Sequence, residues 1–174
     1  MKKIYVTGVS GTGKTTIARE LNTRGYLAIS IDETEGLCSW IDQKTGEHHG
    51  GKEAEMTKEF VDTHNWVCDI DHLNQLLAKS DASIAFVLGM AGNHEDLLHL
   101  FDTIILLQCS PETFCKRIET RTDNDFGKDR EVQRQIVRRS KTYAEEMLAI
   151  GAVAIDTEKS IDEVVDEIIK ISNR

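Results

Sequence analysis

Five short runs of apolar residues alternate along the chain with amphipathic stretches. These runs predict buried β-strands at residues 3–7, 26–31, 82–88, 103–108 and 152–155. Apolar strands that alternate with helices are typical of a parallel sheet covered on both faces. The pattern therefore predicts an α/β fold, a three-layer αβα domain with a five-stranded parallel sheet. Periodicity does not give the strand order.

Helical spacing of apolar residues fills most of the segments between the predicted strands. Pro111 is the only proline and stands where the first turn of a helix is expected, a position that needs no backbone N–H. Ser160 and Glu163 have the spacing of a capping box at the start of the last helix. The predicted helices cover residues 14–22, 66–79, 94–101, a stretch from Pro111, 131–149 and 161–171.

Residues 34 to about 64 are polar, and Gly36, Gly46, Gly50 and Gly51 interrupt them. A long irregular segment inside a compact domain is usually functional. With 174 residues, 40% of them hydrophobic, the chain can form one well-packed domain but is short for two. We therefore expect a single domain over residues 1–174, with an excursion at about 34–66 rather than a linker.

The sequence Gly8-Val9-Ser10-Gly11-Thr12-Gly13-Lys14-Thr15 lies between the first predicted strand and the first predicted helix. It matches GxxxxGK(S/T), and this context favours a phosphate-binding loop over an ordinary glycine-rich turn. The glycines let backbone N–H groups approach phosphate oxygens. Lys14 would reach the β- and γ-phosphates, and the Thr15 hydroxyl would hold Mg²⁺. The predicted nucleotide-binding residues are Gly8, Ser10, Gly11, Thr12, Gly13, Lys14, Thr15 and Thr16.

Asp32 follows the second predicted strand directly, at the sheet edge where open α/β folds place their ligands. Phosphoryl transfer needs a metal anchor and a group that orients the attacking oxygen. A carboxylate at this place can serve either role, and the alternative is a helix-capping or solvated acid. Glu33 and Glu35 are weaker candidates for the same roles.

Arginines surround a polar break at residues 122–130. Arg117 and Arg121 are four residues apart and would share one face of a predicted helix, while Arg138 and Arg139 follow the break. Positive charge from both sides could close over a phosphate during transfer. The alternative is surface ion pairing with neighbouring glutamates and aspartates, which contributes little.

Charged residues make up 29% of the chain and the net charge is −9. This balance argues against a general nucleic-acid binder and against an anionic membrane partner. The first apolar run is too short for a signal peptide, and no stretch approaches the roughly 20 apolar residues of a membrane span. We therefore expect a cytoplasmic protein, monomeric or homodimeric.

The chain has four cysteines and no CxxC pair, which argues against a zinc ribbon or a thioredoxin-like site. Reduced cytosolic thiols are the expected state. His48 and His49 could be grouped with Cys38 as a metal cluster, but a pair of solvated loop histidines explains them better.

The N-terminal phosphate loop, the acid after the second strand and the arginines around the break resemble the P-loop nucleoside and nucleotide kinases. Adenylate, shikimate and gluconate kinases are members of that family. The resemblance covers nearly the whole chain in order and size, although only the phosphate loop is highly specific. It implies ATP- and Mg²⁺-dependent phosphoryl transfer to a small-molecule acceptor. Residues 34–66 would close over the acceptor, and residues 122–130 would form the lid.

The resemblance also implies roles for single residues. Arg117 resembles the nucleotide-facing lid arginine, with Arg121 nearer the phosphates. Arg139, four residues before Tyr143, resembles the arginine that follows the lid. The implied catalytic residues are Lys14, Asp32, Arg117, Arg121 and Arg139; the implied metal ligands are Thr15 and Asp32; and Thr157 would lie at the edge of the adenine pocket.

Two departures from the family pattern leave the acceptor unidentified. The strand at 82–88 has no aspartate at its end, and the loop at 89–93 lacks the Asp-Gly-x-Pro-Arg sequence of adenylate kinases. Two alternatives to a kinase stay open. One is an NTPase that uses water as acceptor. The other is a nucleotide-dependent regulatory or binding module, which exposed Trp40 and Trp66 would favour.

Overall fold

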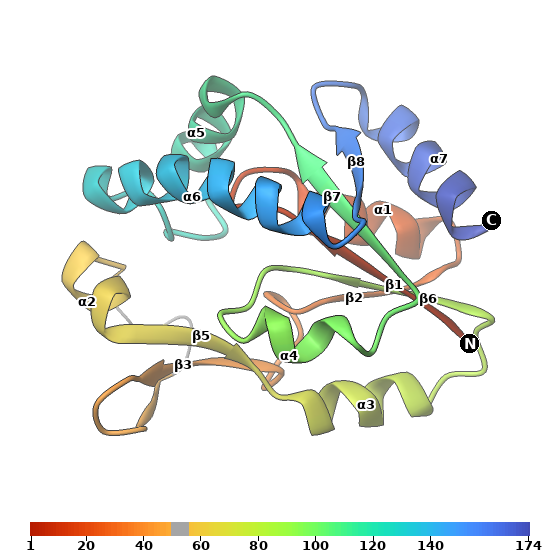
Figure 1. The fold of residues 1–174 in the computed structure, drawn as a ribbon, viewed down its shortest axis with the longest axis horizontal. Helices are drawn as coiled ribbons and strands as arrows, with labels where there is room; N and C mark the ends of the chain where they lie inside the picture. Colours follow the sequence, from red (N-terminus) through yellow and green to blue (C-terminus); the bar gives the residue numbers. More distant parts are fainter. Residues whose placement is uncertain (50–55) are drawn as a thin grey trace.

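The central sheet consists of five strands in the order β2-β6-β1-β7-β8 (Figure 1). The computed structural model describes residues 1–49 and 56–174. Every neighbouring pair in this sheet is parallel. The predicted three-layer αβα fold is confirmed, and the structure adds the strand order. The strands are β1 (Lys2–Thr7), β2 (Leu27–Ser30), β6 (Ile84–Leu88), β7 (Thr103–Gln108) and β8 (Val153–Asp156).

Alternate residues of β1 point to opposite faces of this sheet, so each face has its own core. Ile4 and Val6 pack with side chains of α1 (Lys14–Thr23) and α7 (Ile161–Ser172). Tyr5 packs on the other face. The helices that cover this second face are α3 (Ile70–Ala78), α4 (His94–Leu98) and α6 (Arg130–Ala149).

Local sequence signals fix several helix ends as predicted. Pro111 is the first residue of α5 (Pro111–Thr120), and the Ser110 side chain accepts a hydrogen bond from the N–H of Thr113. Ser160 and Glu163 form the predicted capping box of α7. None of the helices in the described part of the chain is long and apolar enough to cross a membrane.

A second, antiparallel sheet of three strands occupies the region predicted to be irregular (Figure 1). Its order is β4-β3-β5, and a short helix, α2, precedes β5. The prediction was wrong because these strands are short and polar, and β3 pairs with a strand more than 20 residues away. The elements are β3 (Cys38–Asp42), β4 (His48–His49), α2 (Lys58–Thr63) and β5 (His64–Cys68). The predicted breaks at Gly50 and Gly51 lie outside the described residues.

The helix predicted from residue 66 begins only at Ile70, because Trp66 and Val67 belong to β5. Asp69 stops the strand and caps the helix, its carboxylate accepting a hydrogen bond of 2.9 Å from the N–H of His72. His48 and His49 form β4 and are exposed, so they lie in a strand rather than a loop.

The small sheet is attached to the central sheet at the loop that follows β6. The Asn93 side chain accepts from the N–H of Cys68 at 2.9 Å and donates to its carbonyl at 3.0 Å. The N–H of Gly92 donates to the carbonyl of Trp66. A Cβ at Gly92 would lie 1.7 Å from Oδ1 of Asn65, so a larger residue here would displace the Asn65 side chain. These contacts hold β5 beside the C-terminal end of β6.

Candidate active site

The phosphate loop joins β1 to α1. Gly13 has a φ of 96°, and no side chain among the described residues caps the first turn of α1. The backbone N–H groups of this turn carry partial positive charge and are directed toward the loop. Gly11 has a φ of 84°, and a Cβ there would lie 2.5 Å from the Phe114 carbonyl. Close packing of α5 against the loop therefore depends on this glycine.

Lys14 is buried beneath the loop, with 7% of its surface exposed. Its ammonium donates hydrogen bonds of 2.7 Å to the Gly8 carbonyl and 2.9 Å to the Val9 carbonyl. Burial lowers the pKa of Lys14 to about 8, against an opposing effect from Asp32. The positive charge of Arg121 also lowers this pKa. Three predicted site residues thus lie close enough to influence one another.

Asp32 follows β2 and remains accessible to solvent. Its Oδ1 accepts a hydrogen bond of 3.1 Å from the indole Nε1 of Trp66. The surrounding protein displaces part of the water around the carboxyl group and raises its pKa, although Lys14 and the Trp66 hydrogen bond act in the opposite direction. Neighbouring Glu33 instead forms an ion pair with Arg19.

Arg117 joins the phosphate loop to the turn after β8. Its guanidinium donates to the Thr157 carbonyl at 2.7 Å, to the Thr157 hydroxyl at 3.3 Å and to the Gly11 carbonyl at 3.4 Å. Thr157 is buried and donates in turn to the Gln108 carbonyl at 3.1 Å. The structure therefore brings the predicted residues Arg117 and Thr157 together beside the loop.

Arg121 does not share a helix face with Arg117, contrary to the prediction. It follows the last turn of α5 in an extended conformation, with φ of −69° and ψ of 149°. Its guanidinium donates to the carbonyls of Asn124 and Phe126 in the predicted lid. Burial lowers its pKa, and Asp123 and Asp32 oppose this effect. Among the described residues neither Arg117 nor Arg121 forms an ion pair within 4.0 Å, which removes the main alternative for these two side chains.

Arg139 lies apart from these two arginines. Its guanidinium makes two hydrogen bonds to the Glu146 carboxylate, at 2.6 and 2.7 Å, and lies 5.1 Å from the centre of the Tyr143 ring. The Tyr143 hydroxyl is 2.6 Å from the Thr7 hydroxyl at the end of β1. Through Tyr143, Arg139 is thus linked to Thr7, the residue that precedes the phosphate loop.

Aromatic side chains connect the small sheet to the predicted lid. Trp40 is only 8% exposed, and its ring centre lies 5.4 Å from Trp66, 5.5 Å from Phe60 and 5.9 Å from Phe126. Phe126 belongs to the segment between α5 and α6. The exposed Trp40 that would favour a binding module is therefore not observed. Sequence reasoning missed this cluster because its members come from three separate segments.

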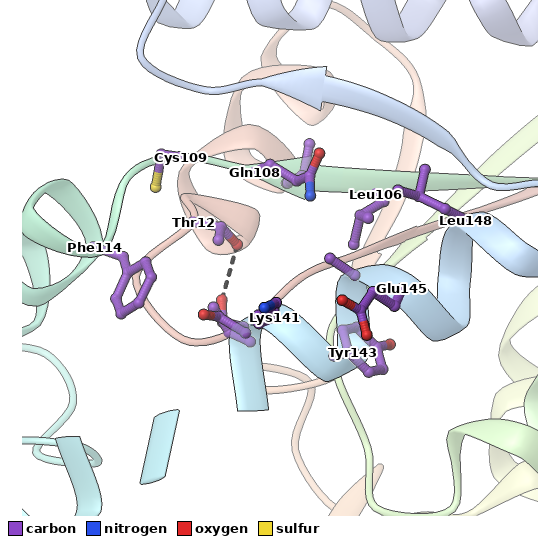
Figure 2. Close-up of a pocket in the computed structure, with 13 residues that line it drawn as sticks. Thr12, Leu106, Gln108, Cys109, Phe114, Lys141, Tyr143, Glu145 and Leu148 are labelled. Atoms are coloured by element: carbon purple, nitrogen blue, oxygen red, sulfur yellow. Dashed lines mark hydrogen bonds between the residues drawn. The ribbon is translucent and has the colours of Figure 1, made fainter. Parts of the chain in front are cut away.

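A cavity of about 300 Å³ lies on the α6 side of the phosphate loop (Figure 2). Lys14 and Asp32 do not line it, whereas Val9 and Thr12 of the phosphate loop do. A more open hollow of about 560 Å³ lies at the ends of β7 and β8, where Gln108, Asp156 and Glu158 line it. The labelled lining of the first cavity is Thr12, Leu106, Gln108, Cys109, Phe114, Lys141, Tyr143, Glu145 and Leu148.

The model of the AAA domain family matches residues 4–138. A Methanocaldococcus jannaschii protein named "Putative adenylate kinase" is 25% identical over 172 residues, which cover 95% of this chain and 85% of that protein. Among solved structures, deoxyadenosine kinase from M. mycoides with bound dATP has a TM-score of 0.56 at 14% identity, over 99% of this chain and 100% of that one. Shikimate kinase from Acinetobacter baumannii in complex with shikimate has a TM-score of 0.58 at 18% identity. This match covers 98% of this chain and 92% of that one. Because the family model covers well over half of the chain, the protein belongs to the AAA domain family, and its fold is that of the small-molecule kinases among these solved structures.

Proposed function

We propose that the protein transfers the γ-phosphoryl group of ATP, in a Mg²⁺-dependent reaction, to a nucleoside, a nucleotide or a hydroxyl-bearing metabolite. One observation carries this proposal. Asp32, delivered by β2, lies close enough to Lys14 for each group to shift the pKa of the other. A cation for the transferred phosphoryl group and a carboxylate for the acceptor are the two charges that this reaction needs.

Lys14 and Arg121 would stabilise the negative charge that develops on the phosphoryl oxygens. Asp32 would orient the acceptor hydroxyl or take its proton. Its raised pKa suits this role, because a general base works best when its pKa approaches the working pH. The hydrogen bond from Trp66 would fix the orientation of the carboxylate while Oδ2 faces the acceptor.

The donor set fits Mg²⁺. The hydroxyl of Thr15 and the carboxylate of Asp32 are hard oxygen donors, and Mg²⁺ is usually held by one or two such groups together with phosphate oxygens. Among the described residues no group of three His, Cys, Asp or Glu side chains could hold a metal alone. When bound, the ion would neutralise charge on the phosphates.

The loop residues would cradle the phosphates through their backbone N–H groups, and the pair of Arg117 and Thr157 would border the nucleotide base. We assign the hollow at the ends of β7 and β8 to the base, because Asp156 and Glu158, the two chain neighbours of Thr157, line it. Arg139 would act at a distance, by holding Tyr143. The cradle residues are Gly8, Ser10, Gly11, Thr12, Gly13, Lys14, Thr15 and Thr16.

We further propose that residues 1–174 act as one kinase domain, in which residues 34–66 cover the acceptor and residues 122–130 form the lid. Contact of Trp40 with Phe126 supports this arrangement, because it places the two segments against each other. Arg121 supports it as well, since its guanidinium donates to the lid carbonyls of Asn124 and Phe126 and its charge lowers the pKa of Lys14.

A transfer screen tests the proposal. The protein is incubated with Mg²⁺, γ-labelled ATP and pools of nucleosides, nucleotides, sugars and hydroxy acids, and labelled products are separated from inorganic phosphate. We expect one pool to give a labelled product and rapid turnover. Equal phosphate release with and without every pool would identify water as the acceptor, and the protein as an NTPase.

A further inference from the structure

Cys38 and Cys68 lie directly opposite each other in the small sheet. Cys38 begins β3 and Cys68 ends β5, and the antiparallel register makes the two residues Cα partners. The four cysteines of the chain are free thiols in the structure. The sequence gives no hint of this pair, since its members are 30 positions apart and form no CxxC motif.

The backbone hydrogen bonds define the type of this pair. The N–H of Asp69 donates to the Leu37 carbonyl at 2.9 Å. This ladder hydrogen bond therefore joins the residues next to Cys38 and Cys68 rather than the two cysteines themselves. The N–H and the carbonyl of Cys68 both turn away from β3 to the side chain of Asn93. This is the pattern of a non-hydrogen-bonded pair, in which Cα atoms are about 4.5 Å apart and side chains approach most closely.

That spacing falls within the range of roughly 4.4–6.8 Å that disulfides span. Each thiol also shifts the pKa of the other, upward for Cys38 and downward for Cys68, because the two groups interact directly. Cys38 is half-buried and Cys68 is 2% exposed, so an incoming reagent meets Cys38 first. The pair thus consists of an accessible thiol and a shielded partner behind it.

We propose that Cys38 and Cys68 form a reversible disulfide that joins β3 to β5 beside Asp32. The oxidant is a low-molecular-weight disulfide such as oxidised glutathione. Cys38 is the accessible thiol, and because its pKa is raised it reacts through a small thiolate fraction. Its Sγ attacks one sulfur of the small disulfide, the S–S bond breaks and one small thiolate leaves. The Cys68 thiolate then attacks Sγ of Cys38 and expels the second small thiolate. Two protein thiols are oxidised and lose two protons, and the small disulfide is reduced to two thiols.

Thiol mapping of the full chain tests this site. The protein is incubated with oxidised glutathione, blocked with iodoacetamide and digested without reduction. We expect two of the four thiols to disappear, the peptides of Cys38 and Cys68 to be linked, and reduced glutathione to restore both thiols. The Tm of the oxidised protein should exceed that of the reduced protein, because the link restricts the unfolded chain.

Three variants complete the test. Cys38→Ser and Cys68→Ser should form no internal link and show no rise in Tm on oxidation. Cys115→Ser, which removes a thiol in α5, should form the link as the wild type does. Recovery of four free thiols from the oxidised wild type would overturn the proposal, as would a link between Cys109 and Cys115 in place of the expected one. None of these outcomes depends on the proposed phosphoryl transfer.

Discussion

The indole Nε1 of Trp66 donates a hydrogen bond of 3.1 Å to Oδ1 of Asp32, and this bond connects the two sheets of the protein. Asp32 follows a strand of the parallel sheet, whereas Trp66 lies within β5 of the antiparallel sheet. Through this hydrogen bond, the small sheet contacts the candidate active site at the carboxylate of Asp32.

Trp66→Phe should lower kcat roughly tenfold and leave the Kd for nucleotide unchanged. The variant keeps an aromatic ring against Trp40 but removes the donor, and a hydrogen bond to a charged group contributes about 1.5–3 kcal/mol. Steady-state kinetics and nucleotide titration give the two quantities. Trp40→Phe is the matched control, because Trp40 packs beside Trp66 without contacting Asp32. An equal loss of kcat in both variants would show that packing, not the hydrogen bond, matters.

Asp32→Asn should lower kcat by about 10²–10⁴-fold, the range for loss of a general base, with a much smaller effect on nucleotide binding. The amide oxygen can still accept from Trp66, so the local geometry persists while the charge is lost. The Tm of the variant should stay close to that of the wild type. If the variant unfolds instead, the carboxylate serves the fold and not the reaction.

Much of the fold could be predicted because its signals are local. Continuous apolar runs mark the five parallel strands, Pro111 marks the start of α5, and the sequence from Gly8 to Thr15 marks the phosphate loop. Each signal lies within a few neighbouring residues. A one-dimensional pattern is sufficient for such elements.

The small sheet could not be predicted, because its stability comes from contacts between distant segments. In β3 only Trp40 is buried, so no run of apolar residues marks the strand. Trp66 and Val67 happen to continue the helical spacing of α3. Asp69 is the sequence signal that could have placed the start of α3 correctly, because an aspartate directly before Ile70 is a typical helix cap.

Some residues of the candidate site could be predicted and others could not, for the same reason. Lys14 and Asp32 could be predicted because each follows a strand that the sequence indicates. Arg121 was placed on a helix because it lies four residues after Arg117, but the helix ends at Thr120 and the chain turns into the lid. The contact of Tyr143 with Thr7 joins residues 136 positions apart and has no local signature.

Nucleotide affinity should decline as the pH rises above about 8. Burial lowers the pKa of Lys14 to about 8, so above this pH the free protein increasingly carries a neutral amine. Phosphate binding requires the ammonium form, and each further pH unit should weaken binding by up to about tenfold. Titration calorimetry across this range measures the effect. Lys14→Met cannot titrate and should lack this decline; a decline of equal size in the variant would assign it to another group.

Arg121→Ala should expose the lid to protease. The side chain holds the carbonyls of Asn124 and Phe126, so its loss frees this backbone even without nucleotide. We expect cleavage at 124–128 to accelerate several-fold. A non-hydrolysable ATP analogue should protect this segment in the wild type but not in the variant.

Arg134→Ala is the control for this experiment. Arg134 pairs with Glu131 on the exposed surface of α6, where an ion pair contributes little. Its cleavage pattern should match that of the wild type. If Arg121→Ala also matches the wild type with and without the analogue, Arg121 neither holds the lid nor closes it.

The central claim is that phosphoryl transfer takes place at the loop that holds Lys14, and the turnover of Lys14→Ala tests it most directly. The measurement is labelled-product formation from ATP and the acceptor found by the transfer screen, with circular dichroism and Tm to verify folding. Loss of a preorganised charge at the transferred group costs about 10²–10³-fold in kcat, and we predict at least this loss in a folded variant. Turnover at the wild-type rate in a folded Lys14→Ala protein would contradict the account.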